Sequence, residues 1–265
     1  MSLLPDVSEL PDRDHQQPPV TLDRRDGPYG EVVLRRRGED LEIIANGCFL
    51  MDTADGRSER LLIQAALDQL SGNQLTGNQL IGDQLAPVAR PSVLIGGLGV
   101  GFSLAYAAAE PRWGRIAVVE REEAIIDWHR AGPLAAFSAG ALDDPRVEIL
   151  HTDLLAYLDG TGSSTGCGTE DTRATYDATY DALCLDIDNG PDWTVTDSNS
   201  GLYRSSGLAA IQRRLNPGGV LAVWSAQPSA AFEQALRTAG FTEVHTLEVT
   251  VARGVPDVVH LARRL

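Results

Sequence analysis

The stretch Ser92-Val-Leu-Ile-Gly-Gly-Leu-Gly-Val-Gly101, followed by the apolar run Phe102–Ala109, decides the fold class of this chain. It joins a short β-rich run, four closely spaced glycines and a segment of helix-forming residues. No residue from Pro91 to Ala109 is charged, so a membrane helix is one interpretation of the segment. Because glycines interrupt its first half, a strand, a tight turn and a helix explain it better.

Downstream of this unit, short apolar runs alternate with segments of helical periodicity. Such alternation is typical of an α/β fold in which a parallel sheet is covered on both faces. The predicted strands are Val93–Ile95, Ile116–Val119, Val147–Leu150, Ala182–Leu185 and Val220–Trp224. The predicted helices are Phe102–Ala109, Glu122–His129, Leu154–Leu158, Leu208–Leu215 and Ser229–Ala239. Two β-rich tails, Glu243–Val251 and Asp257–Leu261, complete a predicted Rossmann-like domain over residues 91–265.

The region upstream of this domain divides into three parts. Residues 1–28 are rich in proline and lack an apolar core, so we expect a flexible leader. Residues 29–57 hold β-rich runs separated by turn signals, which predicts a small antiparallel β domain. Residues 58–90 begin with a helical pattern over Ser58–Leu70 and continue into a five-residue unit that is repeated three times over residues 72–86. We expect this repeat to form a loop.

The chain is acidic, since 22 Lys and Arg against 37 Asp and Glu give a formal net charge of −15. This charge argues against nucleic-acid binding, which depends on neutralising phosphates, and against an anionic membrane surface. The three cysteines show neither a disulfide framework nor CxxC spacing, and the N-terminus does not resemble a signal peptide. We therefore expect a cytoplasmic globular protein that binds a small molecule, with no nucleic-acid or membrane partner.

Several chemically suggestive residues follow predicted strands. In an open α/β sheet ligands bind at the carboxyl ends of the strands, so we expect these residues to meet. They are Gly96, Gly97, Gly99, Gly101, Glu120, Asp153, Asp186 and Asp188. Glycines let the backbone approach a ligand closely, and a carboxylate on the second strand can accept both hydroxyls of a ribose. A tight turn or a solvated strand end explains each feature alone, but together they indicate a nucleoside pocket.

The chain resembles the spermidine synthase family, which belongs to the fold group of S-adenosylmethionine-dependent methyltransferases. The residues that carry the resemblance are Val93-Leu-Ile-Gly-Gly, Val118-Val-Glu120, Pro145-Arg-Val-Glu-Ile, Thr152-Asp153, Tyr180-Asp-Ala-Leu-Cys-Leu-Asp186 and Leu215-Asn-Pro-Gly-Gly-Val. The N-terminal strands and the helix start at Ser58 also resemble the family's small β domain, so the similarity covers residues 30 to 263. It implies a seven-stranded Rossmann-like sheet preceded by a small antiparallel β domain, and a homodimer.

The resemblance also implies roles for individual residues. The implied cofactor-binding residues are Gly96, Gly97, Gly99, Gly101, Glu120, Asp153 and Leu154. Among them, Glu120 would hold the ribose of S-adenosylmethionine and Asp153 its adenine amino group. Asp186 would be the catalytic acid that orients and deprotonates an attacking amine, with Asp188 beside it. A carboxylate suits this role, because an in-line displacement at a carbon next to sulfur mainly requires a positioned, unprotonated nucleophile.

The sequence departs from the family pattern in the glycine loop and on the acceptor side. Gly99 stands where the family has the Asp that binds the amine of decarboxylated S-adenosylmethionine. The helix that carries polyamine-binding residues has Glu59, Leu62 and Gln64 in the matching register. Because a carboxylate at position 99 would repel the carboxylate of ordinary S-adenosylmethionine, its absence favours methyl transfer to a small amine or hydroxyl acceptor. The alternatives are aminopropyl transfer from decarboxylated S-adenosylmethionine, and a non-catalytic nucleoside-binding or interaction protein.

The acceptor candidates follow the fourth predicted strand of the sheet. We expect Asn189, Trp193 and Tyr203 to line an acceptor pocket, the alternatives being a turn for Asn189 and a core role for the aromatic side chains. The oxygen ligands of Asp186-Ile-Asp188-Asn189 would also suit Mg²⁺. Since shaping the following turn explains Asp188 and Asn189 better than a metal ion does, we predict no metal site.

Overall fold

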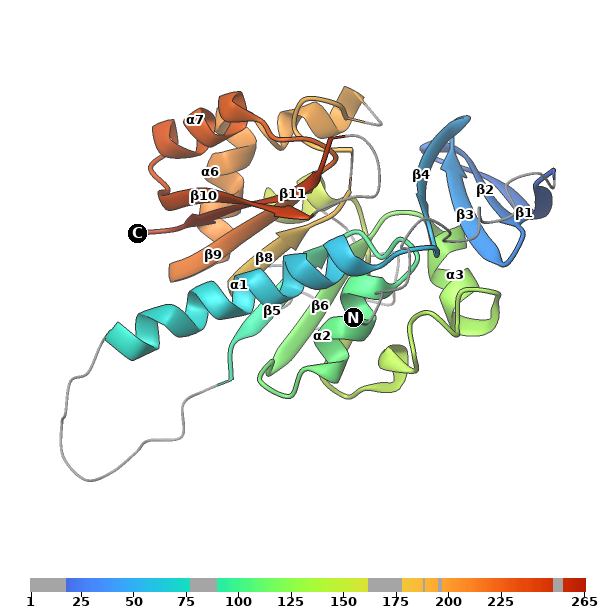
Figure 1. Cartoon of the computed structure of the whole chain (residues 1–265), viewed down its shortest axis with the longest axis horizontal. Coiled ribbons are helices and arrows are strands. Elements are labelled where there is room, and N and C mark those ends of the chain that lie inside the picture. Colours follow the sequence, from blue (N-terminus) through green and yellow to red (C-terminus); the bar gives the residue numbers. More distant parts are fainter. Residues whose placement is uncertain (1–17, 77–89, 162–177, 188, 195–196, 250–254) are drawn as a thin grey trace, which may run out of the picture. The chain divides into compact units, whose positions relative to one another are not determined.

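A computed structural model of the chain describes residues 18–76, 90–161, 178–187, 189–194, 197–249 and 255–265 (Figure 1). The chain divides into two compact units, one ending at Ala54 and the other running from Asp55 to Leu265, and each is considered by itself. The second and third units of the repeat, over residues 77–86, and the candidate catalytic residue Asp188 lie outside the described residues.

The first unit contains a four-stranded antiparallel sheet in the order β1-β2-β3-β4. Its strands are β1 (Val20–Gly27), β2 (Gly30–Arg37), β3 (Asp40–Ala45) and β4 (Cys48–Asp52). Asn46 and Gly47 turn the chain between β3 and β4 with φ values of 50° and 78°, as a type I′ hairpin turn requires. β1 lies where we expected a flexible leader, so that expectation does not hold for residues 20–27. Nearly all side chains of β1 are exposed, which is why its sequence lacks the apolar alternation of a half-buried strand.

The second unit is built on a seven-stranded sheet in the order β10-β11-β9-β8-β5-β6-β7, which confirms the predicted fold class. Its strands are β5 (Ser92–Gly96), β6 (Arg115–Glu120), β7 (Val147–His151), β8 (Tyr180–Leu185), β9 (Leu215–Ser225), β10 (Thr242–Val249) and β11 (Asp257–Arg263). Five neighbouring strands of the sheet run parallel, namely β7, β6, β5, β8 and β9. β11 is antiparallel to both of its neighbours, β9 and β10. β9 begins at Leu215, so the last residue of the helix predicted over 208–215 belongs to this strand.

Helices pack against both faces of this sheet (Figure 1). They are α1 (Arg57–Thr76), α2 (Phe102–Ala109), α3 (Glu123–Ala131), α4 (Leu154–Leu158), α6 (Ser205–Arg214) and α7 (Ala230–Thr238), with 3-10 turns at Ala141–Asp143 and Asp197–Gly201. α1 lies across β8, β9 and β11, and it extends beyond its predicted end to include the first repeat unit. Within the described residues, none of the helices is long and apolar enough to cross a membrane.

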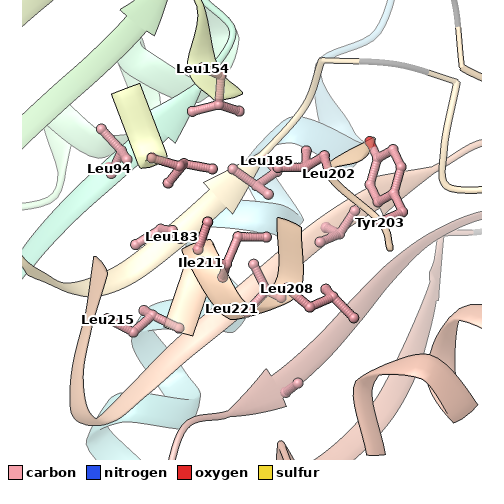
Figure 2. Close-up of a cluster of buried hydrophobic side chains, with 14 of the residues drawn as sticks. Leu94, Leu154, Leu183, Leu185, Leu202, Tyr203, Leu208, Ile211, Leu215 and Leu221 are labelled. Carbon is pink, nitrogen blue, oxygen red and sulfur yellow. The ribbon is translucent and has the colours of Figure 1, made fainter. Parts of the chain in front are cut away.

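The alternation of β8 shows how the two faces are separated. Cys184 points toward α1, where its Sγ lies 4.0 Å from the Leu62 carbonyl oxygen. Leu183 and Leu185, which have the opposite parity, belong to the core cluster formed with α4, α6 and the strands beside β8 (Figure 2). β8 is therefore buried on both faces, and the residue that follows it is held firmly at the edge of the sheet.

Candidate active site

The strand order reverses direction at β5, which has β6 on one side and β8 on the other. Open α/β sheets bind ligands beyond the carboxyl ends of the strands at such a point. Three predicted site elements meet there: the glycine loop after β5, Glu120 at the end of β6, and Asp186 after β8. The Asp186 N–H donates to the Gly96 carbonyl oxygen (3.0 Å), and the Gly97 N–H donates to the Val119 carbonyl oxygen (2.9 Å).

The glycine loop is pressed closely against the end of β8. Gly97, Gly99 and Gly101 have φ values of 93°, 50° and 98°, a backbone region that side chains rarely adopt. A Cβ on Gly97 would lie only 2.5 Å from the Asp186 carbonyl oxygen, so glycine is required here by both conformation and space. The loop therefore brings bare backbone to the edge of the sheet next to Asp186.

Glu120 fixes the other side of the same loop. Its side chain is 6% exposed, and its Oε2 accepts a hydrogen bond from the Leu98 N–H (3.0 Å). Its Oε1 accepts from the Glu122 N–H (2.8 Å), which ties β6 to the start of α3. Burial raises the pKa of Glu120, and the backbone donors oppose that shift. The carboxylate predicted to hold a ribose thus lies in contact with the glycine loop.

Asp153 and Leu154 follow β7 and begin α4. Asp153 Oδ1 accepts a hydrogen bond from the Ala156 N–H (3.0 Å), so this carboxylate caps the helix. Leu154 is buried in the core cluster, and its Cδ2 would be 2.9 Å from a Cβ placed on Gly96. Leu154 therefore packs beneath the glycine loop, at the same sheet edge as Asp153.

Asp186 lies within an acidic cluster that sequence reasoning identified only in part. Burial raises the pKa of Asp186 well above its ordinary value, and the charges of Glu59 and Asp257 raise it further. Glu59 is buried in the first turn of α1, where it accepts a hydrogen bond from the Ser58 hydroxyl (2.9 Å). Burial also raises the pKa of Glu59 and of Asp257, with the exposed carboxylate of Asp55 adding to both shifts.

Asp257 is the site residue that the sequence analysis did not identify. It opens β11, and β11 is antiparallel to β9, so its first residue lies at the carboxyl edge of the parallel strands. The negative charge of Asp55 is partly balanced by Arg57, whose guanidinium lies 2.6 Å from Asp55 Oδ2. In the sequence, Asp257 is visible only as an acidic residue at the start of the last predicted strand. Its position near Asp186 depends on where that strand lies in the sheet and on its direction.

The predicted acceptor residues are not gathered into one site. Trp193 is 65% exposed, whereas Tyr203 is 8% exposed and belongs to the core cluster (Figure 2). The Tyr203 ring packs edge-on against Phe232, with 5.6 Å between the ring centroids. The carbonyl oxygen of Asn189 accepts from the Ala226 N–H (3.1 Å), which fixes the turn after Asp186 to the end of β9.

Among the described residues, no group of three or more His, Cys, Asp or Glu side chains is placed to hold a metal ion.

Comparison with known proteins shows what the chain is similar to. No family model matches it. It is 28% identical over 206 residues to the polyamine aminopropyltransferase of Mycobacterium tuberculosis, covering 77% of this chain and 32% of that protein. It is 30% identical over 170 residues to polyamine aminopropyltransferase 2 of Pseudomonas aeruginosa, covering 60% of this chain and 42% of that protein. The chain thus spans less than half the length of these relatives.

Solved structures agree on the fold. The spermidine synthase of Thermotoga maritima matches with a TM-score of 0.64 and 15% identity, covering 92% of this chain and 73% of that one. A spermidine synthase in complex with the transition-state analogue AdoDATO matches with a TM-score of 0.64 and 16% identity, covering 92% of this chain and 72% of that one. The resemblance to the spermidine synthase family predicted from the sequence is confirmed.

The prediction of methyl transfer is wrong, because the relatives in sequence are named as polyamine aminopropyltransferases. The prediction gave too much weight to one side chain. Gly99 does lack the carboxylate that the family places in the loop, but Glu59, Asp186 and Asp257 supply carboxylates from three other elements of the same unit. The negative charge of the site therefore does not depend on position 99.

Proposed function

We propose that this chain is an aminopropyltransferase of the spermidine synthase type, which transfers the aminopropyl group of decarboxylated S-adenosylmethionine to a diamine or polyamine. The observation that carries the proposal is the set of carboxylates at the sheet edge, Asp186, Glu59 and Asp257, beside the glycine loop. Buried ammonium groups require pairing with anions, so such a set suits a substrate that is a dication. The similarity to polyamine aminopropyltransferases supports the same substrate class.

The residues present fit the donor nucleoside. Gly97 lets the loop backbone lie against the Asp186 carbonyl oxygen, where a Cβ would be only 2.5 Å away. Glu120 offers a buried carboxylate to hydroxyl groups, and the acidic cluster favours a cationic sulfonium over a neutral thioether. We infer that Gly96, Gly97, Gly99, Gly101 and Glu120 hold the donor. The adenine contact of Asp153 and the donor-binding role of Leu154 stay predictions.

The proposed chemistry needs little from the protein beyond position and one base. When bound, the donor supplies a methylene carbon activated by the sulfonium, so that the amine nitrogen forms a bond to carbon while the carbon–sulfur electron pair leaves with sulfur. Asp186 would orient the attacking amine and accept its proton. Its raised pKa makes it a stronger base than an ordinary carboxylate, which is what removing a proton from an alkylammonium requires. Glu59 and Asp257 would hold the charge of the acceptor.

The experiment is to incubate the chain with decarboxylated S-adenosylmethionine and, in turn, putrescine, cadaverine and spermidine, and to measure the release of 5′-methylthioadenosine. We expect release with at least one acceptor and its loss in Asp186→Asn. The exposed substitution Asp159→Asn serves as the matched control. Absence of release with every acceptor would overturn the proposal. A cytoplasmic location and a homodimer stay predictions that this assay does not address.

A further inference from the structure

Two side chains hold neighbouring backbone groups of the glycine loop. Glu120 Oε2 accepts from the Leu98 N–H (3.0 Å), and His129 Nε2 lies 2.9 Å from the carbonyl oxygen of Gly99. Glu120 ends β6, and His129 lies in the last turn of α3. The loop is therefore held from two elements at successive residues, with one group accepting and the other donating.

The direction of the histidine bond follows from its chemistry. A carbonyl oxygen can only accept, so Nε2 must carry the proton and donate it to Gly99. His129 is 2% exposed, and burial lowers the pKa of its imidazole against the opposing effect of hydrogen bonds to the Gly99 and Leu134 backbone. Burial therefore favours the neutral ring, with its proton on Nε2. The ring also lies directly under the loop, because a Cβ on Gly101 would be 2.6 Å from His129 Cε1.

An apolar side chain would be sufficient if this position served only to fill space. Instead, a polar ring is buried with its donor on the carbonyl oxygen of Gly99, a loop residue that has no side chain of its own to fix its backbone. Three left-handed glycines give the loop many alternative conformations, and holding one of them costs conformational entropy that fixed contacts offset. A fixed loop binds its ligand without first having to be ordered.

We propose that His129 is a positioning residue for the glycine loop, which it holds through the Gly99 carbonyl in the conformation that receives the donor nucleoside. The proposal rests on the proposed function for the identity of that nucleoside. The hydrogen bond between His129 and the Gly99 carbonyl does not depend on the proposed function, because it is present in the protein without a ligand. His129 touches neither the reacting atoms nor the acidic cluster in this account, and it acts only through the loop.

The first test uses the free protein and needs no substrate. Nitrogen-15 NMR of the histidine rings at pH 7 is expected to show His129 as the neutral tautomer protonated at Nε2. Hydrogen exchange at the Leu98 and Gly101 amides is expected to be about tenfold or more faster in His129→Leu, and close to wild type in His129→Gln, whose amide N–H can still donate. An Nδ1-protonated ring, or unchanged exchange in both variants, would overturn the proposal.

The second test separates positioning from general packing. If transfer is observed, His129→Leu is expected to raise the KM for decarboxylated S-adenosylmethionine about tenfold, with kcat changed by less than about threefold, and His129→Gln to recover most of the loss. The control is His260→Gln, a ring that is equally buried on β11 and packs against Phe232 away from the loop. It is expected to lower the melting temperature while leaving the donor KM unchanged.

These outcomes are distinguishable from failure of the proposed function. If no aminopropyl transfer occurs but the ring tautomer and the loop exchange respond as expected, the proposed function fails and the loop anchor stands. If transfer occurs while His129→Leu and His129→Gln both keep the wild-type donor KM, the proposed function stands and the positioning role is wrong.

Discussion

Asp257, at the start of β11, lies close enough to Asp186, which follows β8, for its negative charge to add to the burial that raises the pKa of Asp186. β8 and β11 lie on either side of β9. β8 runs parallel to β9 and β11 runs antiparallel to it, so the end of one strand and the start of the other reach the same edge of the sheet. The topology alone brings these two acids together, and the first prediction follows from their proximity.

Asp257→Asn removes one of the carboxylates that would pair with a dicationic acceptor. We expect the KM for the preferred diamine to rise about 5- to 30-fold, as expected for the loss of one charge-assisted contact worth about 1–2 kcal/mol, with a smaller effect on kcat. Steady-state kinetics of 5′-methylthioadenosine release measure this. The exposed substitution Asp68→Asn on α1 is the control. An unchanged diamine KM would place Asp257 outside the acceptor site.

The raised pKa of Asp186 predicts how the stability of the protein depends on pH. Its pKa is higher in the folded protein than in the unfolded chain, so its contribution to stability is fully present below about pH 4 and is lost as pH rises through the folded pKa. An asparagine cannot ionise and escapes this loss. Asp186→Asn is therefore expected to be more stable than wild type by about 1–3 kcal/mol at pH 8, with a smaller difference at pH 5.

Urea unfolding of both proteins at pH 5 and pH 8 measures this difference. Comparing the variant with wild type cancels the contribution of carboxylates whose pKa is lowered by arginine partners, such as Glu110 and Glu243, because that contribution changes with pH in the opposite direction. If Asp186→Asn were the less stable protein at pH 8, the burial of a charged Asp186 would not be the dominant effect.

Much of the second unit could be predicted from sequence because its signals are local. β5 and β6 are short apolar runs that end in Gly96 and Glu120, and the apolar run of β8 is followed directly by Asp186. Glu120 and Asp186 were found because each directly follows such a run. Their position at one edge then follows from the geometry of a parallel sheet.

The residues that sequence reasoning missed or misassigned depend on nonlocal contacts. Asp257 becomes part of the site only because β11 is antiparallel and lies beside β9. Tyr203 is near Asp186 in sequence, yet it packs in the core against Phe232. His129 was recognised only as a residue of a predicted helix, because nothing in the sequence relates that helix to the carbonyl of Gly99.

Glu120→Gln tests the other anchor of the glycine loop. An amide has one acceptor oxygen, so it can satisfy only one of the Leu98 and Glu122 N–H groups, and the other is left without its partner. Leaving a buried donor unpaired costs about 1–3 kcal/mol. We expect the affinity for 5′-methylthioadenosine, measured by calorimetry, to fall about 10- to 100-fold. The control is Glu123→Gln at the start of α3, where the side chain is exposed, and it is expected to leave the affinity unchanged. Equal affinities for the two variants would contradict a role for Glu120 in the donor site.

Gly99→Asp tests whether the missing loop carboxylate affects the choice of donor. Gly99 has a φ of 50°, a conformation that Asp tolerates better than most residues, so the fold should accept it at a cost of about 1 kcal/mol. A carboxylate at this position would attract the amine of decarboxylated S-adenosylmethionine and repel the carboxylate of the ordinary form. We therefore expect the ratio of the two dissociation constants to shift about tenfold or more toward the decarboxylated form.

Competition calorimetry with both nucleosides gives this ratio directly, and Gly140→Asp is the matched control. Gly140 also has a left-handed φ, of 75°, and a Cβ there would meet nothing within 4 Å, so it reports the backbone cost of the substitution alone. A shift in the Gly99 variant that is absent from the Gly140 variant would show that position 99 faces the aminopropyl end of the donor. Identical ratios in wild type and Gly99→Asp would mean that discrimination between the two donors resides in Glu59, Asp186 and Asp257.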